Sequence, residues 1–256
     1  MHFLIQSKIV HFDLKGSNIL YNKLENLPTI IDFGLSINMD NILDGNGRLK
    51  MSLVELQKEF TTFGPDYFLW SLEIHYLSYL IYIDLYPNDE NLFEIVNVFV
   101  NNNIPLRRNY SSDFLNKYKE LCYKQLLKYN SIEIMARITL ILNYWKTWDN
   151  YSLSCMYLLI LSYINLDGNA SNDFMIFNSK ILLTNMHPNP EKRLSIIETI
   201  DKFKELLLND KYNNVENFEN MKNKLANNKG KVIIEINKDS KIIKNSKHRM
   251  KKMMKI

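Results

Sequence analysis

The pattern of hydrophobic and polar residues changes near residue 70. Before it, short runs rich in Ile, Val, Leu and Tyr are typical of β-strands, and they lie at residues 8–11, 19–21 and 27–31. After it, apolar residues recur at helical spacing. This spacing predicts helices at residues 91–100, 111–128 and 132–148, with a break at 101–105. The sequence therefore predicts a small β element followed by a mainly helical body.

Polar residues suited to phosphate chemistry lie between and after the β-type runs. Residues 11–20 read HFDLKGSNIL and residues 31–34 read IDFG. Phosphoryl transfer needs an acceptor for a hydroxyl proton, a cation near the transferred phosphate and oxygen ligands for Mg²⁺. Strand alternation would direct Asp13, Asn18 and Asp32 towards one shared cleft. The alternative is a hairpin whose polar residues merely cap a turn.

The two strings resemble the catalytic loop, H-x-D-L-K-x-x-N, and the D-F-G metal loop of the protein-kinase family. Three further segments resemble family motifs, in the family order. Trp70–Glu73 corresponds to Ala-Pro-Glu, residues 149–154 to D-x-W-S-x-G, and residues 187–193 to the final P-x-x-R segment. The Trp form of the first of these resembles kinases of large DNA viruses. The resemblance covers residues 1 to about 208, in patches.

This resemblance implies ATP and Mg²⁺ as cofactors and a protein as the substrate. Asp13 would be the catalytic base, and Lys15 would stabilise the γ-phosphate. Asn18 and Asp32 would be the Mg²⁺ ligands, and Leu20 would support the adenine ring from below. The D-L-K-x-x-N form, with Lys15, favours transfer to serine and threonine. The leading hypothesis is therefore a serine/threonine protein kinase.

Two long-range contacts are implied by the same motifs. The Asp149 carboxylate is expected to accept hydrogen bonds from backbone amides of the catalytic loop, although this residue alone could be a plain helix N-cap. Glu73 and Arg193 are expected to form a buried ion pair, although Arg193 alone could be a solvated charge. Because the Asp13 carboxylate is expected to face the cleft, Asp13→Asn is expected to leave stability nearly unchanged.

The fold class implied is mainly α: a kinase-like C-terminal lobe with a small β-hairpin at the catalytic loop. Met1–Ser7 would be the last turns of the helix that leads into this loop. We expect the small N-terminal lobe to be absent from this chain, since only ten residues precede His11 and no G-x-G-x-x-G occurs. We expect a truncated or split kinase with a separately encoded N-lobe as a partner, little turnover by this chain alone, and bare apolar surface at His11 and Phe33.

Two other hypotheses stay open. A lone kinase-like lobe could be a non-catalytic binding module or scaffold, which the missing lobe favours and the intact motif residues disfavour. A helical protein could also carry the motif by coincidence.

The lobe is predicted to span residues 1–208, with a helical insertion at about 74–148. Arg107 and Arg108 are expected in a loop of that insertion, where a solvated turn is preferred over contact with an acidic substrate.

A polar linker and a basic tail are predicted at residues 209–256, with some helix in the linker and a short strand at 231–236. From residue 222 onwards there are twelve Lys and Arg residues and two acidic ones, whereas the whole chain carries a net charge of +4. A solvated tail is the preferred interpretation. Contact of the tail with nucleic acid or an anionic membrane is the alternative.

The remaining composition fits one globular unit, since 256 residues of which 46% are hydrophobic can bury a substantial core. Cys122 and Cys155 lie in apolar helical contexts and are predicted to be buried thiols. The sequence shows no signal peptide and no apolar stretch long enough to cross a bilayer. We therefore expect no transmembrane segment and a cytoplasmic location, in the host cytoplasm if the source is a virus.

Overall fold

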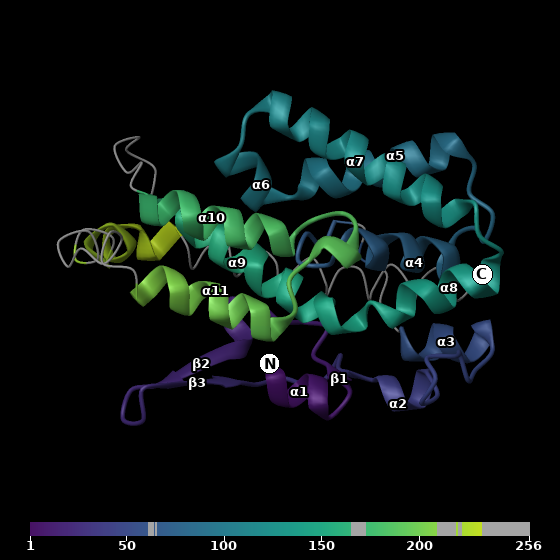
Figure 1. Cartoon of the computed structure of the whole chain (residues 1–256), viewed down its shortest axis with the longest axis horizontal. Coiled ribbons are helices and arrows are strands. Elements are labelled where there is room, and N and C mark those ends of the chain that lie inside the picture. The colour runs from purple at the N-terminus through teal and green to yellow at the C-terminus, as the bar shows by residue number, and fades with distance from the viewer. Residues whose placement is uncertain (61–63, 65, 165–172, 209–218, 220–221, 232–256) are drawn as a thin grey trace.

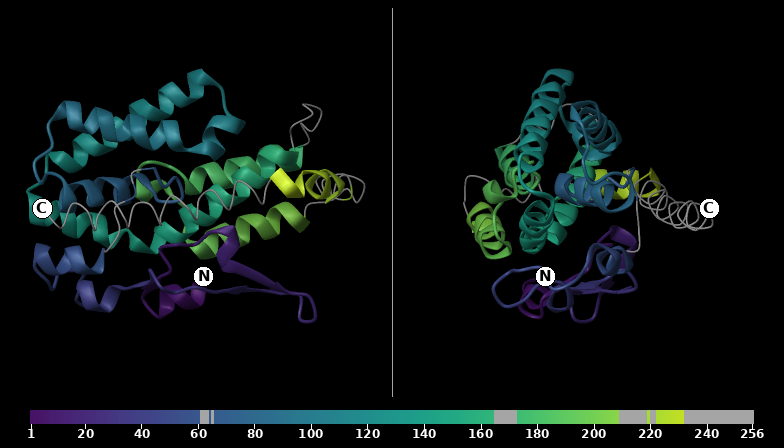
Figure 2. Two further views of the ribbon diagram at one scale, coloured as in Figure 1. Left: turned by 180° about the vertical axis from the view of Figure 1, so that it is seen from behind. Right: turned by 90° about the vertical axis from the view of Figure 1, so that its right-hand side faces the viewer.

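A computed structural model of the chain describes residues 1–60, 64, 66–164, 173–208, 219 and 222–231. The described part is mainly helical with a small β-hairpin, as the sequence predicts, and it has a second two-stranded sheet that was not predicted. Its elements lie in three layers in Figure 1: a β-containing layer along the bottom, a group of helices in the middle and a helical layer along the top. Figure 2 shows the same order of layers from two further sides.

The bottom layer comes from the first part of the chain, drawn in purple and dark blue in Figure 1. Its elements are α1 (His2–Gln6), β1 (Ile9–Val10), the 3-10 helix η1 (Gly16–Asn18), β2 (Ile19–Asn22), β3 (Leu27–Ile30), β4 (Ile37–Asn38), α2 (Met39–Ile42) and α3 (Leu53–Glu59). β2 and β3 form an antiparallel hairpin, and β1 pairs antiparallel with β4. The three predicted β-type runs are therefore strands, and the predicted helix before them is α1.

The middle and top layers are helical. They contain α4 (Leu72–Tyr82), α5 (Asp89–Asn102), α6 (Ile104–Asn109), α7 (Ser112–Asn130), α8 (Ile134–Asn143), the 3-10 helix η2 (Trp145–Thr147), α9 (Trp148–Ile164), α10 (Asp173–Asn185), the 3-10 helix η3 (Pro190–Lys192) and α11 (Ile196–Leu208). α9 is buried on nearly all sides and packs against both α6 and α10. A helix that is apolar all round belongs in the centre of a core.

Two details of the helical prediction are wrong. The helix expected at 132–148 ends at Asn143, and α9 starts separately at Trp148. Arg107 and Arg108 lie in α6 and not in a loop. The reason is that the Asn103 side chain accepts a hydrogen bond from the amide of Leu106, at 3.1 Å, and that proline is tolerated in a first helical turn. The predicted break therefore starts a new helix.

The helices of the predicted insertion at 74–148 share their core with the rest of the chain. α4 is buried along most of its length, and side chains of α5, α7 and α8 belong to the same hydrophobic cluster as those of α9 and β1. They therefore stabilise the body and are not an appendage. The boundaries of the lobe at 1–208 stay a prediction.

Most of the predicted linker and tail lies outside the described residues, so its solvated, nucleic-acid and membrane interpretations stay predictions. Residues 222–231 are helical. The strand predicted at 231–236 starts at the last residue of that helix, and the rest of it is outside the described part.

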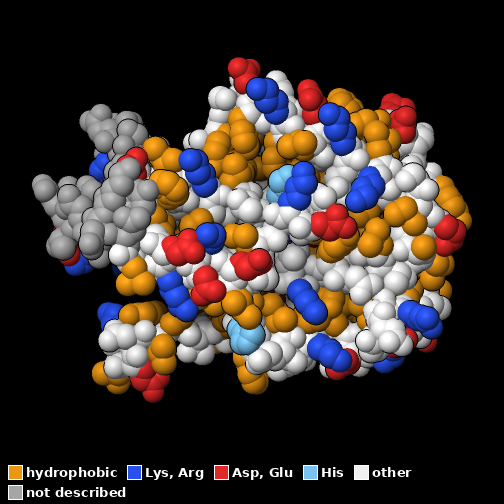
Figure 3. All heavy atoms as spheres, viewed as in Figure 1, with side chains coloured by type: hydrophobic (Ala, Val, Ile, Leu, Met, Phe, Trp, Pro, Cys, Tyr) orange, Lys and Arg blue, Asp and Glu red, His pale blue; other side chains and the backbone are white. Residues whose placement is uncertain are grey.

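The surface and the two cysteines bear on the remaining predictions. On the face shown in Figure 3, basic and acidic side chains are interspersed. Cys122 and Cys155 are buried free thiols, as predicted. No helix within the described ranges has the length and apolarity needed to cross a membrane.

Candidate active site

The backbone of the loop at residues 11–13 is held by Asp149, near the start of α9. Its carboxylate accepts hydrogen bonds from the backbone amides of His11, at 2.7 Å, and Phe12, at 3.1 Å. Burial raises the pKa of the Asp149 carboxyl above its ordinary value, and the two amide hydrogen bonds oppose that rise. The predicted hydrogen bonds from backbone amides of this loop to Asp149 are confirmed, and its role exceeds that of a plain N-cap.

The Asp13 side chain is the centre of a buried polar cluster. Its Oδ2 accepts a hydrogen bond from Lys15 Nζ, at 2.7 Å, and another from Asn18 Nδ2, at 3.2 Å. Its Oδ1 accepts one from the hydroxyl of Tyr67, at 2.8 Å. Asn18 also donates to the backbone carbonyl of Asp13, at 2.9 Å, which fixes the amide against the loop.

The expectation that Asp13 and Asn18 face an open cleft is wrong, because each is only 5% exposed. Lys15 and Tyr67 cover the carboxylate from two sides. The structure therefore brings Asp13, Lys15 and Asn18 together as predicted, but in a closed arrangement.

Asp32 is placed beside this cluster by the β2–β3 hairpin. The hairpin pairing ends at Ile19 and Ile30. One residue further on, the amide of Ile31 donates to the carbonyl of Asn18, at 2.9 Å, and Asp32 is the next residue in the chain. Asp32 is exposed and accepts one long hydrogen bond, from the amide of Gly34, at 3.4 Å. A Cβ at Gly34 would come within 3.2 Å of the Asp32 carboxylate, so glycine suits this turn. Within the described residues, no hydrogen bond joins the Asp32 carboxylate to Asp13 or Asn18.

Four non-glycine residues of the described part have a positive φ, namely Lys8, Phe12, Asn26 and Asp32, and two of them lie at this site. Phe12 and Asp32 both have a φ of +64°, which is uncommon for residues other than glycine. The Phe12 peptide is held by Asp149 at its amide and by Trp70 Nε1, which donates to its carbonyl at 2.8 Å. Such strain persists only where the surroundings over-determine the backbone, and it clusters at functional sites.

The residues beside the loop differ in their exposure to solvent. Leu20 is 54% exposed and Phe33 is 46% exposed, so the predicted bare surface exists at Phe33. The same prediction is wrong for His11, which is 0% exposed. Its ring lies 4.9 Å from the ring of Phe33, and its Nε2 is 3.0 Å from the carbonyl oxygen of Ile31, so the D-F-G turn covers it.

The first turn of α4 is joined to the segment between η3 and α11 by an ion pair. Arg193 donates from Nη1 and Nη2 to the two carboxylate oxygens of Glu73, at 2.5 and 2.8 Å, and both side chains are almost fully buried. Although burial disfavours its charge, Glu73 holds the pKa of Arg193 above its ordinary value. The predicted pair is confirmed, and the alternative of a solvated Arg193 is wrong.

Sequence reasoning missed Tyr67 as a contact of the site. The only signal was its place a few residues before Glu73. In the structure the Tyr67 ring packs edge-on against Trp70, and its carbonyl contacts His75 Nε2 at 3.1 Å. This packing directs the Tyr67 hydroxyl at Asp13.

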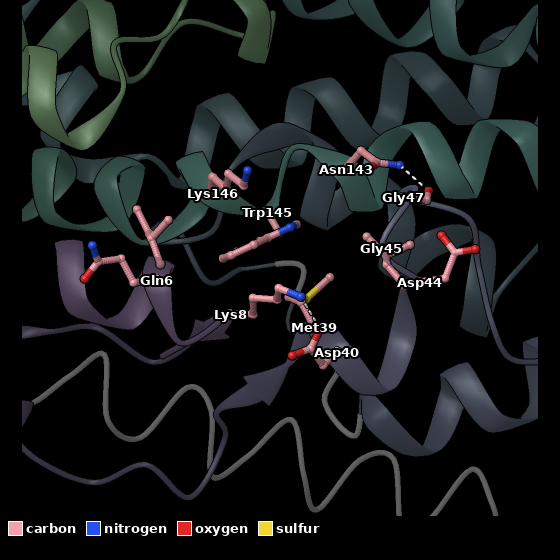
Figure 4. Close-up of a pocket in the computed structure, with 12 residues that line it drawn as sticks. Gln6, Lys8, Met39, Asp40, Asp44, Gly45, Gly47, Asn143, Trp145 and Lys146 are labelled. Carbon is pink, nitrogen blue, oxygen red and sulfur yellow. Dashed lines mark hydrogen bonds and ion pairs between the residues drawn. The ribbon is translucent and has the colours of Figure 1, made fainter.

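A separate cavity of about 410 Å³ lies between α1, α2 and η2. Figure 4 shows Trp145 and Lys146 on one side of it and the Lys8–Asp40 ion pair on the other. None of the five predicted site residues lines it.

The oxygen donors of the site are of the kind that bind Mg²⁺ together with water and phosphate, and they do not form a metal site made of protein ligands alone. Within the described ranges, no cluster of three or more His, Cys, Asp or Glu side chains fits a metal. Asn18 Oδ1 takes only a long hydrogen bond from Ser17, at 3.4 Å, and the Asp32 carboxylate is exposed. Mg²⁺ commonly uses one or two such ligands together with water and phosphate oxygens, so this donor set fits it.

No protein-family model, no curated protein and no solved structure matches the chain.

Proposed function

We propose that this chain is the catalytic lobe of a serine/threonine protein kinase, which transfers the γ-phosphate of ATP to protein hydroxyl groups. The observation that carries the proposal is the Asp13–Lys15–Asn18 cluster, on a loop that Asp149 clamps through two backbone amides. A carboxylate, an ammonium group and an amide in contact are the groups that phosphoryl transfer requires.

Each side chain has one task in this proposal. Asp13 accepts the proton of the substrate hydroxyl. Lys15 lies 2.7 Å from Asp13 and balances charge on the transferred phosphate. Asn18 and Asp32 hold the metal through their oxygens, and Mg²⁺, when bound, neutralises charge on the phosphates. Leu20, exposed on β2, offers an apolar surface for the adenine.

Mg²⁺-dependent ATP binding tests the metal assignment. The intact chain is titrated with ATP in the presence and absence of Mg²⁺ by equilibrium dialysis. We expect Asp32→Asn to weaken Mg²⁺-dependent binding at least about tenfold, as a lost metal ligand does. Asp84→Asn is the matched control, since Asp84 is also exposed and also accepts a hydrogen bond from the amide two residues on. Equal ATP affinity in the Asp32 variant and the parent chain would contradict the assignment.

The burial of Asp13 favours a second candidate function, a non-catalytic kinase-like binding module. A carboxylate that is 5% exposed and already accepts hydrogen bonds at both oxygens has little room for a substrate. ATP binding without phosphate transfer in any variant would select this candidate.

A further inference from the structure

The Tyr67 hydroxyl occupies the oxygen of Asp13 that the proposed reaction needs. Oδ2 already has Lys15 and Asn18 as donors, so Oδ1 is the oxygen with capacity for a substrate hydroxyl. Oδ1 accepts a hydrogen bond from the Tyr67 hydroxyl, at 2.8 Å. A general base must lie within about 2.6–3.2 Å of the hydroxyl that it deprotonates, so Tyr67 stands where the substrate hydroxyl would stand.

Burial makes the two hydroxyls exclusive. The Asp13 side chain is 7% exposed and Tyr67 is 1% exposed, so little of the carboxylate faces solvent where a second donor could approach it beside the tyrosine. A substrate hydroxyl can reach Oδ1 only after the Tyr67 hydroxyl has left it.

Tyr67 differs from the other two donors of Asp13 in its charge and in the segment to which it belongs. Lys15 carries the charge that balances Asp13, and Asn18 is tied a second time to the Asp13 carbonyl. Tyr67 is neutral and belongs to a different segment, which approaches the loop from α4. We propose, resting on the kinase function proposed above, that Tyr67 is an internal competitor of the substrate: its hydroxyl holds the catalytic carboxylate closed until a substrate hydroxyl replaces it.

Tyr67→Phe tests this proposal, because it removes the hydroxyl and keeps the ring against Trp70. The intact chain is incubated with ATP, Mg²⁺ and a mixture of serine- and threonine-containing peptides, and phosphopeptides are quantified by mass spectrometry. Transfer is expected to rise about tenfold, which is the effect of losing a hydrogen bond to a charged acceptor. Tyr67→Phe combined with Asp13→Asn is expected to show no rise.

Tyr118→Phe is the matched control. Tyr118 is also buried and also donates its hydroxyl to a buried oxygen, the carbonyl of Met186, at 2.6 Å, but it is remote from Asp13 in the hydrogen-bond network. The Tyr118→Phe variant is expected to phosphorylate the peptides at the same rate as the parent chain. If both variants raise transfer equally, general loosening explains the rise and the proposal is overturned.

Hydrogen exchange of residues 66–75, measured without nucleotide, gives a readout that is independent of turnover. Tyr67→Phe is expected to speed exchange of the Trp70 amide, which donates to the Tyr67 carbonyl at 3.1 Å, and Tyr118→Phe is expected to leave it unchanged. Unchanged exchange in Tyr67→Phe would overturn the closed state.

The rate of phosphate transfer to the peptides then distinguishes the explanations that the exchange experiment leaves open. Faster exchange with lower or unchanged transfer would overturn the competition, since Tyr67 would then orient Asp13 or play no part. Absence of both transfer and Mg²⁺-dependent ATP binding in every variant would count against the proposed function. In that case faster exchange in Tyr67→Phe alone would still support the hold of Tyr67 on Asp13.

Discussion

Two buried ion pairs in the described part of the chain are built in different ways. Glu73 and Arg193 lie 120 positions apart and share two contacts, with side chains that are 0% and 1% exposed. Asp13 and Lys15 lie in one loop and share a single contact of 2.7 Å, with side chains that are 7% and 10% exposed. The first pair joins distant segments, whereas the second joins neighbours.

The two carboxylates also differ in how many hydrogen-bond donors surround them. The Glu73 carboxylate receives both of its described hydrogen bonds from Arg193, so it depends on one partner. Asp13 also has Asn18 and Tyr67 as donors, so no single partner is indispensable. The comparison teaches that the first pair joins two distant segments of the fold, and that the carboxylate of the second pair is shared among three donors.

Arg193→Ala has the largest expected effect on this comparison. It leaves the Glu73 carboxylate buried without its partner, which costs roughly 3–5 kcal/mol of unfolding free energy. Chemical denaturation with urea measures the loss. The control is Lys204→Ala, which removes an exposed ion pair with Asp201 and is expected to cost less than about 1 kcal/mol. Similar costs for the two variants would remove the distinction between anchor and surface pair.

Asp149→Asn ranks second. Its amide nitrogen would replace one of the two acceptor oxygens that hold His11 and Phe12, leaving one buried amide without an acceptor. A buried donor that loses its partner costs about 1–3 kcal/mol. We expect a loss of about 2 kcal/mol in the same denaturation experiment, and faster hydrogen exchange at His11 and Phe12. A loss as large as that of Arg193→Ala would make the loop, and not the ion pair, the main anchor.

The stability of the segment around Tyr67 is expected to depend on pH through His75. Burial lowers the pKa of His75 to about 4, whereas the unfolded chain binds that proton near pH 6.5. The unfolded state therefore binds more protons below pH 6.5, and folding stability falls as the pH falls. Between pH 7 and pH 5.5 the loss is about 1 kcal/mol.

His75→Gln isolates this effect from His187, whose pKa is also lowered by burial. The parent chain is expected to lose about 1 kcal/mol more than the variant over that pH range. Parallel stability profiles for the two proteins would show that His75 does not titrate as its burial requires.

Lys15→Met has the smallest expected effect. Asp13 keeps the donors Asn18 and Tyr67, and the methionine fills the volume of the lysine stem. We expect a cost of about 1 kcal/mol or less, as for a single net hydrogen bond. A cost near that of Arg193→Ala would mean that the Asp13–Lys15 pair is also a structural anchor, and the comparison would fail.

The sequence predicted those parts of the site that lie within a motif. The order of Asp13, Lys15 and Asn18, the grip of Asp149 and the Glu73–Arg193 pair were all predictable, because each has a characteristic residue type at a characteristic place. The β-type runs before and after Asn18 also predicted the hairpin.

Burial and closure of the site could not be predicted in the same way. The burial of His11 depends on the Phe33 ring, and that of Asp13 depends on Tyr67, 54 positions away. No local pattern reports how closely such segments approach. Arg107 was misplaced for a related reason: its break residues also fit a helix start, and only the Asn103 cap distinguishes the two.

Transfer of the γ-phosphate from ATP to peptide serine and threonine by the intact chain tests the central claim most directly. The parent chain is compared with Asp13→Asn at ATP and Mg²⁺ concentrations that give both proteins equal nucleotide occupancy. Turnover by this chain alone is expected to be small, and a general base contributes about 10²–10⁴-fold, so Asp13→Asn is expected to lower that small rate at least about 100-fold without loss of ATP binding. Equal transfer rates would contradict the account, because Asp13 would then be a structural residue in a buried polar cluster.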